Sequence, residues 1–344
     1  MGIKNDCLIR VLQGKSTARK PIWIMRQAGR YLPEYRKLRK KAGDFLNLCK
    51  TPELACQTTL MPVTRYDLDA AIIFSDILIV PEAMGMPLKF EEKKGPVFQN
   101  QIKNETDLAG LKIPSIETDL QFTLKAIEIT KKELNNRIPL IGFVGSPWTL
   151  ACYMIDGGAS KTFENTFKMM YDRPVLLLEL LEKLSIILTE YLKLQVKYGA
   201  DALMIFDTWG GILPYSKYEE FSLNFNKNII ASLNNAKIPN IFFSKGAFNH
   251  IEKILNIEPS CVGLDWTTSL KEAQKTIKGR VAIQGNLDPS ILLSSEKVVQ
   301  QETNKMLNEI DSQTRHIVNL GHGITPGANP NNIEILIDTV RKYK

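Results

Sequence analysis

The chain has 344 residues, a formal net charge of +7 and a hydrophobic fraction of 44%. These values are those of an ordinary globular protein and exclude a disordered or fibrous chain. The five cysteines are odd in number and include no Cys-x-x-Cys pair. This usage is typical of buried free thiols in a cytoplasmic protein and disfavours a zinc ribbon. No apolar run is long enough to span a membrane, so we expect no membrane association.

Eight short apolar segments recur along the chain, and each is followed by polar or glycine residues. Their nearly continuous apolar character is typical of strands buried on both faces of a parallel sheet. The predicted strands are Pro21–Met25, Ala70–Phe74, Pro139–Val144, Ala202–Phe206, Asn240–Phe243, Cys261–Leu264, Val281–Ile283 and His316–Leu320.

Helical patterns lie between these segments. Thr51 followed by Pro52 is a typical helix start, Ser269–Glu272 has the spacing of a capping box, and Val175–Leu194 has the pattern of a long amphipathic core helix. The alternation predicts an α/β protein with one domain over residues 1–344, a distorted (β/α)8 TIM barrel. A doubly wound open sheet is the alternative, but no Gly-x-Gly-x-x-Gly follows the first predicted strand.

Two further segments have patterns that predict their structure. Residues 88–98 alternate in polarity on both sides of a charged turn, which predicts a small β-hairpin inserted after the second strand. The densest basic run, Arg36–Lys41, has no interleaved aromatic residues. We interpret it as the solvated face of a helix that continues to Leu48, and we expect no nucleic-acid partner.

The active site of such a barrel lies at the carboxyl ends of its strands, which gives a short set of candidates. In chain order they are Arg26, Gln27 and Arg30; Ser75 and Asp76; Gly145, Ser146, Pro147 and Trp148; Asp207, Thr208 and Trp209; Ser244 and Lys245; Asp265; Gln284 and Asn286; and Asn319, Gly321, His322 and Gly323. Tyr153 lies one turn into the helix that follows the third strand.

The residue types at these positions suggest a chemistry but leave alternatives open. Arg26 and Arg30, four residues apart, suit the capture of carboxylates or phosphate, with structural ion pairs as the alternative. Asp76 fits a general base, a metal ligand, a counter-charge for a cation or a helix N-cap. His322 has no Cys at metal-ligand spacing, which favours a hydrogen-bonding role. Tyr153 fits either a pocket or core packing.

Two long motifs bring these candidates together. Pro21–Arg36 (PIWIMRQAGRYLPEYR) and Gly142–Met154 (GFVGSPWTLACYM) resemble the two signatures of the uroporphyrinogen decarboxylase family. Phe74–Leu78, Phe206–Gly211 and Gly321–Ile324 match the family pattern in the same order. Thr208 stands where some members carry Ser, which keeps the hydroxyl.

The resemblance implies a distorted (β/α)8 barrel that works as a homodimer in haem synthesis. It implies removal of CO2 from the four acetate side chains of uroporphyrinogen III, giving coproporphyrinogen III, with neither metal nor organic cofactor. It also implies a transition-state-stabilising role for Asp76 and catalytic roles for Arg26 and Arg30. The implied substrate-binding residues are Arg26, Gln27, Ala28, Gly29, Arg30, Asp76, Tyr153, Thr208 and His322.

One rival shares this barrel by resemblance, namely a zinc-dependent methyltransferase that acts on corrinoid or cobalamin substrates. Such enzymes hold zinc with a His-x-Cys motif and a later Cys. In this chain Ile324 stands two residues after His322, and no Cys follows Cys261. The sequence therefore favours the decarboxylase.

Overall fold

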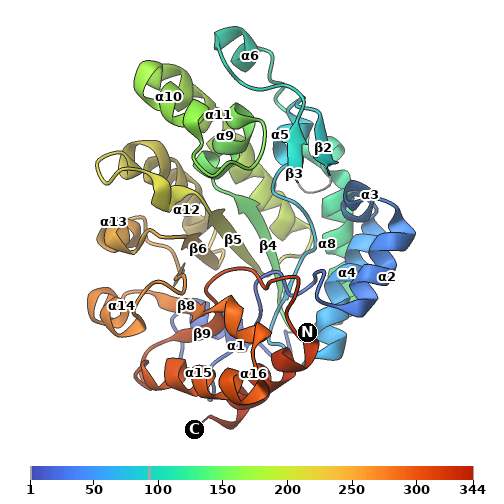
Figure 1. The fold of residues 1–344 in the computed structure, drawn as a ribbon, viewed down its shortest axis with the longest axis vertical. Helices are drawn as coiled ribbons and strands as arrows, with labels where there is room; N and C mark the ends of the chain where they lie inside the picture. Colours follow the sequence, from blue (N-terminus) through green and yellow to red (C-terminus); the bar gives the residue numbers. More distant parts are fainter. Residues whose placement is uncertain (1, 92–93, 344) are drawn as a thin grey trace.

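Seven parallel strands form the centre of the molecule in a computed structural model that describes residues 2–91 and 94–343. Each strand pairs with the next in one curled sheet, in the order β1-β4-β5-β6-β7-β8-β9 (Figure 1). They are β1 (Ala71–Ile72), β4 (Leu140–Gly145), β5 (Ala202–Asp207), β6 (Asn240–Ser244), β7 (Cys261–Gly263), β8 (Ala282–Leu287) and β9 (His316–Leu320).

The first predicted strand, Pro21–Met25, is wrong as a strand, because only Ile22 forms a bridge, to Val318 of β9. The segment still lies between the two edges of the sheet. The amide of Val318 donates to the carbonyl of Pro21 (2.8 Å), and the amide of Asp69 donates to the carbonyl of Ile22 (2.8 Å). This segment therefore takes the eighth place in a distorted barrel.

The strands bury both faces, as their continuous apolar runs predict. Alternate residues point into the barrel, where Ile141, Met204, Phe243 and their neighbours form one cluster with Leu8 of the first helix. The intervening residues pack outward against the helices in a second, larger cluster. The interior is thus filled with side chains, and the functional groups must lie at the ends of the strands.

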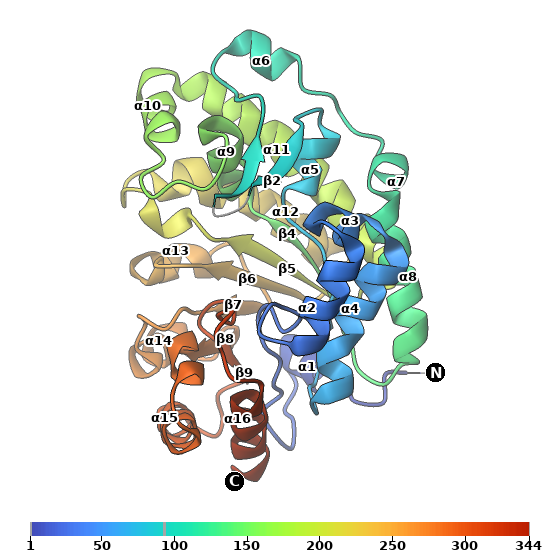
Figure 2. The ribbon, with the colours of Figure 1, turned by 45° about the vertical axis from the view of Figure 1, so that its right-hand side comes forward.

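Most helices lie around the outside of the barrel (Figures 1 and 2), whereas the first contributes Leu8 to the cluster inside it. The helices are α1 (Cys7–Leu12), α2 (Pro33–Ala42), α3 (Phe45–Lys50), α4 (Pro52–Arg65), α5 (Ile79–Ala83), α6 (Glu105–Ala109), α7 (Ile116–Asp119), α8 (Gln121–Leu134), α9 (Pro147–Asp156), α10 (Glu164–Asp172), α11 (Pro174–Lys197), α12 (Asn224–Asn235), α13 (Ile251–Leu255), α14 (Leu270–Ile277), α15 (Glu296–Asn308) and α16 (Pro330–Lys342). Short helical turns of other types cover Gly210–Ile212, Glu219–Leu223, Phe248–His250 and Pro289–Leu293. None of the described helices is both long and apolar enough to cross a membrane.

The basic run at residues 36–41 lies on α2 and is mostly exposed, as predicted. The prediction that this helix continues to Leu48 is wrong. Gly43 adopts a φ of 84° and ends α2, and Asp44 then caps α3 by accepting a hydrogen bond from the amide of Asn47. Glycine permits this left-handed conformation at little cost, so the chain turns between two helices.

The predicted hairpin is confirmed. Strands β2 (Leu88–Glu91) and β3 (Gly95–Phe98) pair antiparallel, with Leu88 opposite Phe98. Residues 92 and 93 of the predicted turn lie outside the described residues. Val97 of β3 also forms a bridge to Gly158, so the hairpin is fixed to the loop that follows α9.

Four of the five cysteines are buried free thiols, as predicted, and Cys7 is half-buried. Burial raises the pKa of each of them, Cys7 included. A thiol with a raised pKa is a poor nucleophile at neutral pH, so these cysteines are packing residues.

Asp69 fastens the seam at which the barrel closes. Its fully buried carboxylate accepts hydrogen bonds from Arg19 (2.6 and 2.8 Å), Arg341 (2.8 Å), Asn5 (2.7 Å) and the amide of Ile22 (2.7 Å). Burial alone would raise the pKa of Asp69, but the hydrogen bonds from Arg19 and Arg341 outweigh it and hold this pKa below the usual value.

We expect Asp69→Asn to lower the free energy of unfolding by about 3 kcal/mol, because removing one partner of a buried ion pair leaves the others unpaired. A depressed carboxylate pKa adds stability above the unfolded pKa, and this stability is lost as pH falls through the folded pKa. Urea titrations from pH 3 to 7 should therefore show a weaker acid dependence in the variant. Asp338→Asn, which removes an exposed pair with Lys342, is the control and should leave both quantities unchanged.

Candidate active site

The loop that carries Arg26 is fixed by hydrogen bonds to the last strand and to the loop that follows it. Asn319 of β9 accepts from the amide of Met25 (2.8 Å), and the carbonyl of Met25 accepts from the amide of Ile324 (2.9 Å). Arg26 has a φ of 62°, in the left-handed region that non-glycine residues rarely adopt. Arg26 and Arg30 lie on turns, not on one helix, and both are exposed.

Gln27 supports this loop from inside. It is 1% exposed, and its side chain accepts from the amide of Ile24 (3.1 Å) and donates to the carbonyl of Ala70 (3.2 Å). Ala28 and Gly29 are half-buried beside it. A side chain at Gly29 would lie only 3.2 Å from the Arg26 carbonyl oxygen. The Gln27 side chain thus shapes the loop and has its own partners inside the fold.

The Arg26 side chain crosses the loop that carries His322. A Cβ atom added at Gly323 would lie 2.3 Å from Cδ of Arg26, so only glycine leaves room for it. The guanidinium charge reaches three of the predicted residues, since it affects the pKa values of Asp76, Tyr153 and His322. Arg26 is therefore the residue around which these candidates gather.

Asp76 follows β1 and lies half-buried in the mouth of the barrel. Its Oδ1 accepts a hydrogen bond from the amide of Leu78 (2.8 Å), just before α5, and no partner of Oδ2 is found among the described residues. Burial raises the pKa of Asp76, while the Leu78 amide and the Arg26 charge oppose that rise. A carboxylate oxygen without a partner in such a place is available to a ligand.

Tyr153 of α9 lies in an aromatic group with Phe163 and Trp209. Its ring centroid is 6.3 Å from that of Phe163 and 6.4 Å from that of Trp209. Burial raises the pKa of Tyr153, and the nearby charge of Asp76 raises it further. The hydroxyl is thus held protonated near Asp76 and can donate a hydrogen bond. The packing interpretation is confirmed, and the pocket interpretation stays a prediction.

Thr208 and Trp209 lie on a loop fixed by a buried carboxylate. Asp207 is fully buried and accepts hydrogen bonds from Ser146 (2.6 Å), Ser244 (3.0 Å), Ser222 (3.0 Å) and Tyr218 (3.2 Å). The Trp148 indole donates to the carbonyl of Trp209 (2.9 Å). Thr208 itself is half-buried. Tyr218 and Ser222 were not predicted, because nothing in their sequence spacing relates them to Asp207.

His322 lies half-buried between two aromatic rings. Its ring centroid is 6.2 Å from that of Phe243 and 6.2 Å from that of Trp266, in edge-on geometry. Burial, together with the charges of Arg26 and Lys245, lowers the pKa of His322 to about 4. The imidazole is therefore neutral at pH 7 and can both donate and accept a hydrogen bond.

Several other candidates at strand ends have structural partners instead. Gln284 and Asn286 lie within β8, which extends beyond its predicted end to Leu287. Gln284 accepts from the indole of Trp23 (2.8 Å), and Asn286 donates to the carbonyls of Asp265 (2.8 Å) and Thr268 (2.7 Å). Both side chains are buried and serve the fold.

Arg30 is not brought into contact with the other candidates. Within residues 2–91 and 94–343, its side chain makes no ion pair or hydrogen bond with them. Its carbonyl accepts a hydrogen bond from Arg36 (2.8 Å). Its positive charge opposes the rise that burial causes in the pKa of Tyr35. The charge of Arg26 thus acts on Asp76, Tyr153 and His322, whereas Arg30 lies at the exposed edge of the loop.

Comparison with known protein families identifies the family of this chain. A family model described as "Uroporphyrinogen decarboxylase (URO-D)" matches residues 3–343. The chain belongs to the uroporphyrinogen decarboxylase family. Curated relatives named uroporphyrinogen decarboxylase include one from Ruthia magnifica, 48% identical over 97% of this chain and 98% of its own length. Another, from Acinetobacter baylyi, is 46% identical over 99% of this chain and 97% of its own.

Solved structures with the same fold carry other names. A methyltransferase from Methanosarcina mazei superposes with a TM-score of 0.83 over 99% of both chains, at 19% sequence identity. A B12-independent methionine synthase from Shewanella has a TM-score of 0.56 at 10% identity and covers 95% of this chain and 96% of its own. At such identities the likeness shows the barrel alone, and family membership favours decarboxylation over methyl transfer.

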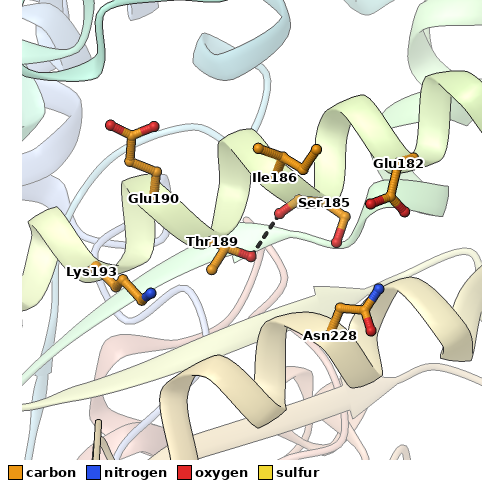
Figure 3. A pocket seen from close by; sticks show the side chains of 7 residues that line it. All are labelled: Glu182, Ser185, Ile186, Thr189, Glu190, Lys193 and Asn228. Atoms are coloured by element: carbon orange, nitrogen blue, oxygen red, sulfur yellow. Dashed lines mark hydrogen bonds between the residues drawn. The ribbon is translucent and has the colours of Figure 1, made fainter. Parts of the chain in front are cut away.

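A surface groove lies elsewhere on this member of the uroporphyrinogen decarboxylase family. Figure 3 shows it between α11 and α12, on the outer side of the barrel. It is lined in part by Glu182, Ile186, Glu190 and Lys193, and Thr189 uses its hydroxyl to donate to the carbonyl of Ser185 (2.7 Å). The groove is separate from the strand ends where the family signatures gather.

Proposed function

We propose that this chain catalyses the decarboxylation of the four acetate side chains of uroporphyrinogen III, giving coproporphyrinogen III and CO2 in haem synthesis. The observation that carries the proposal is the position of Asp76 in a protein of this family. Its half-buried carboxylate lies at a strand end with one oxygen bound to the Leu78 amide, beside the charge of Arg26.

Decarboxylation requires a group that accepts an electron pair. When CO2 leaves an acetate, the remaining carbon holds an electron pair, and many decarboxylases pass this pair to a cofactor. A pyrrole can accept it after protonation of a ring carbon, because the protonated ring is cationic. We therefore propose that the reaction needs neither a metal nor an organic cofactor.

Asp76 stabilises that cationic ring in this proposal. Its carboxylate accepts hydrogen bonds from the pyrrole N–H groups, and its negative charge matches the intermediate better than the neutral ground state. Arg26 helps to keep the half-buried Asp76 ionised, because its charge lowers the pKa of the carboxyl that burial raises. Preorganised charge of this kind is more effective away from bulk water.

The remaining residues bind the substrate. Uroporphyrinogen carries eight carboxylates, and the guanidinium groups of Arg26 and Arg30 suit their bidentate capture. Tyr153, Thr208 and His322 supply hydrogen bonds to the acetate or propionate groups, and the loop of Gln27, Ala28 and Gly29 shapes the approach. We also propose that the enzyme is one domain and a cytoplasmic homodimer that binds no nucleic acid.

The test is an anaerobic assay with uroporphyrinogen III, without added metal or cofactor, in which the carboxyl groups of the products are counted by chromatography. We expect eight carboxyl groups to fall to four. A protein that leaves the substrate unchanged, but binds zinc stoichiometrically and methylates thiols, would support the methyltransferase alternative instead.

A further inference from the structure

Lys245 lies at the carboxyl end of β6, on a continuous set of loops around the mouth of the barrel. A Cβ atom at Gly211, on the loop after β5, would lie 2.1 Å from the Lys245 carbonyl oxygen. On the other side, the amide of Gly246 donates to the carboxylate of Asp265, which follows β7. The backbone of Lys245 is thus held between the loop of Thr208 and the loop of Trp266.

The loop after β7 in turn lies against the loop of His322. A Cβ atom at Gly321 would lie 2.3 Å from the amide nitrogen of Trp266, so the two backbones touch. Asn286 fixes this loop by donating to the carbonyls of Asp265 and Thr268. The positions of Lys245 and Trp266 relative to His322 are therefore set by backbone packing.

The Lys245 ammonium lies over an aromatic ring and has no ion-pair partner among the described residues. Its Nζ lies 5.5 Å from the centroid of the Trp266 ring, and the Trp266 ring lies edge-on to His322 with centroids 6.2 Å apart. Lys245 is half-buried, and no ion pair of its ammonium is found in the described part of the chain. The nearby Asp265 carboxylate is already occupied by the amides of Gly246 and Thr267.

We propose that the Lys245 ammonium, supported on the Trp266 ring, binds a side-chain carboxylate of the tetrapyrrole substrate, apart from the centre formed by Asp76 and Arg26. The proposal rests on the proposed function, which supplies a ligand with eight carboxylates. A half-buried ammonium without a protein partner is most favourable when an anion arrives. A 38% exposed tryptophan beside it offers an apolar surface to a pyrrole ring of the substrate.

The reaction itself takes place elsewhere, so the contact should be the same in the ground state and in the transition state. Interactions of that kind raise affinity without changing the chemical step. Lys245→Met keeps the apolar stem over Trp266 and removes the charge. We expect it to raise KM for uroporphyrinogen about fivefold, with kcat within about twofold of the wild type, as the loss of one partly solvated charged contact implies.

The matched control is Lys253→Met. Lys253 of α13 also lies over an aromatic ring, 4.7 Å from the centroid of Tyr215, but its ammonium pairs with Glu219. Its KM should not change.

Lys245→Arg, which keeps a cation, should restore KM. The difference in KM between wild type and Lys245→Met should shrink as salt rises to 0.5 M, because screening weakens the contact. Lys245→Gln repeats the measurement if Lys245→Met does not fold.

Inhibition by the product distinguishes the two kinds of carboxylate. Coproporphyrinogen retains the propionates and lacks the acetates, so a parallel rise in its inhibition constant assigns a propionate, and an unchanged constant assigns an acetate. A KM within about twofold of the wild type in folded Lys245→Met, or a fall in kcat at unchanged KM, overturns the proposal. A wild-type protein without turnover would instead reject the proposed function.

Discussion

Replacing Asp76 with Asn is expected to lower kcat at least about 100-fold, because the amide keeps the shape of the carboxylate and loses the charge that stabilises the cationic ring. KM should change much less, since the ground-state substrate has neutral pyrroles. Single-turnover assays under anaerobic conditions measure the chemical step directly. Turnover near that of the wild type would remove Asp76 from the reaction.

Two controls separate charge from packing in that experiment. Asp76→Glu keeps the charge but moves it, and should recover part of the lost rate. Asp44→Asn changes the exposed N-cap of α3, where Asn caps as well as Asp. Its kcat and its thermal unfolding midpoint should both match those of the wild type.

Replacing Arg26 with Gln should lower kcat/KM at least about tenfold, through the loss of a charged hydrogen bond to the substrate. It should also change the pH profile. Arg26 lowers the pKa of Asp76, so without it this pKa rises further above its usual value. Activity that needs the carboxylate is then lost at a higher pH, and the acid limb of kcat/KM shifts upward.

The same variant reports on His322. Arg26 contributes to lowering the pKa of His322 to about 4, so this pKa should rise in Arg26→Gln. The chain has only 3 His, which makes the titration accessible to NMR. Arg26→Lys keeps the charge and should leave both pKa values nearly unchanged while losing bidentate binding. Arg39→Gln, on the outer helix α2, should behave as the wild type in both measurements.

The sequence predicted the barrel correctly, since seven of the eight apolar runs form strands. It could not predict that Pro21–Met25 forms an irregular segment with a single bridge. Two backbone amides of that segment are bound by side chains instead of a neighbouring strand. The amide of Ile24 donates to Gln27 and that of Met25 donates to Asn319, which is 294 residues away. The bond to Asn319 leaves no trace in local periodicity, and it fixes the residue that precedes Arg26.

Where a strand end and a family motif coincide, as at Asp76, Thr208 and His322, the side chain is half-buried after a strand, and its role stays a prediction. The candidate site was predicted poorly where polarity alone was the guide. Gln284 and Asn286 follow an apolar run as His322 does, yet they are buried by hydrogen bonds to Trp23 and to the carbonyls of Asp265 and Thr268. Only the three-dimensional partners of a polar side chain tell a structural amide from one that faces a ligand.

The seam closed by Asp69 has a consequence for synthesis of the chain. Arg341 binds Asp69 across 272 residues, whereas Arg19 is 50 residues from it. In a growing chain on the ribosome, Asp69 can bind Arg19 early. It can bind Arg341 only after nearly the whole barrel has been translated. The early strands of the barrel must therefore remain soluble, with an unfinished edge, until α16 emerges.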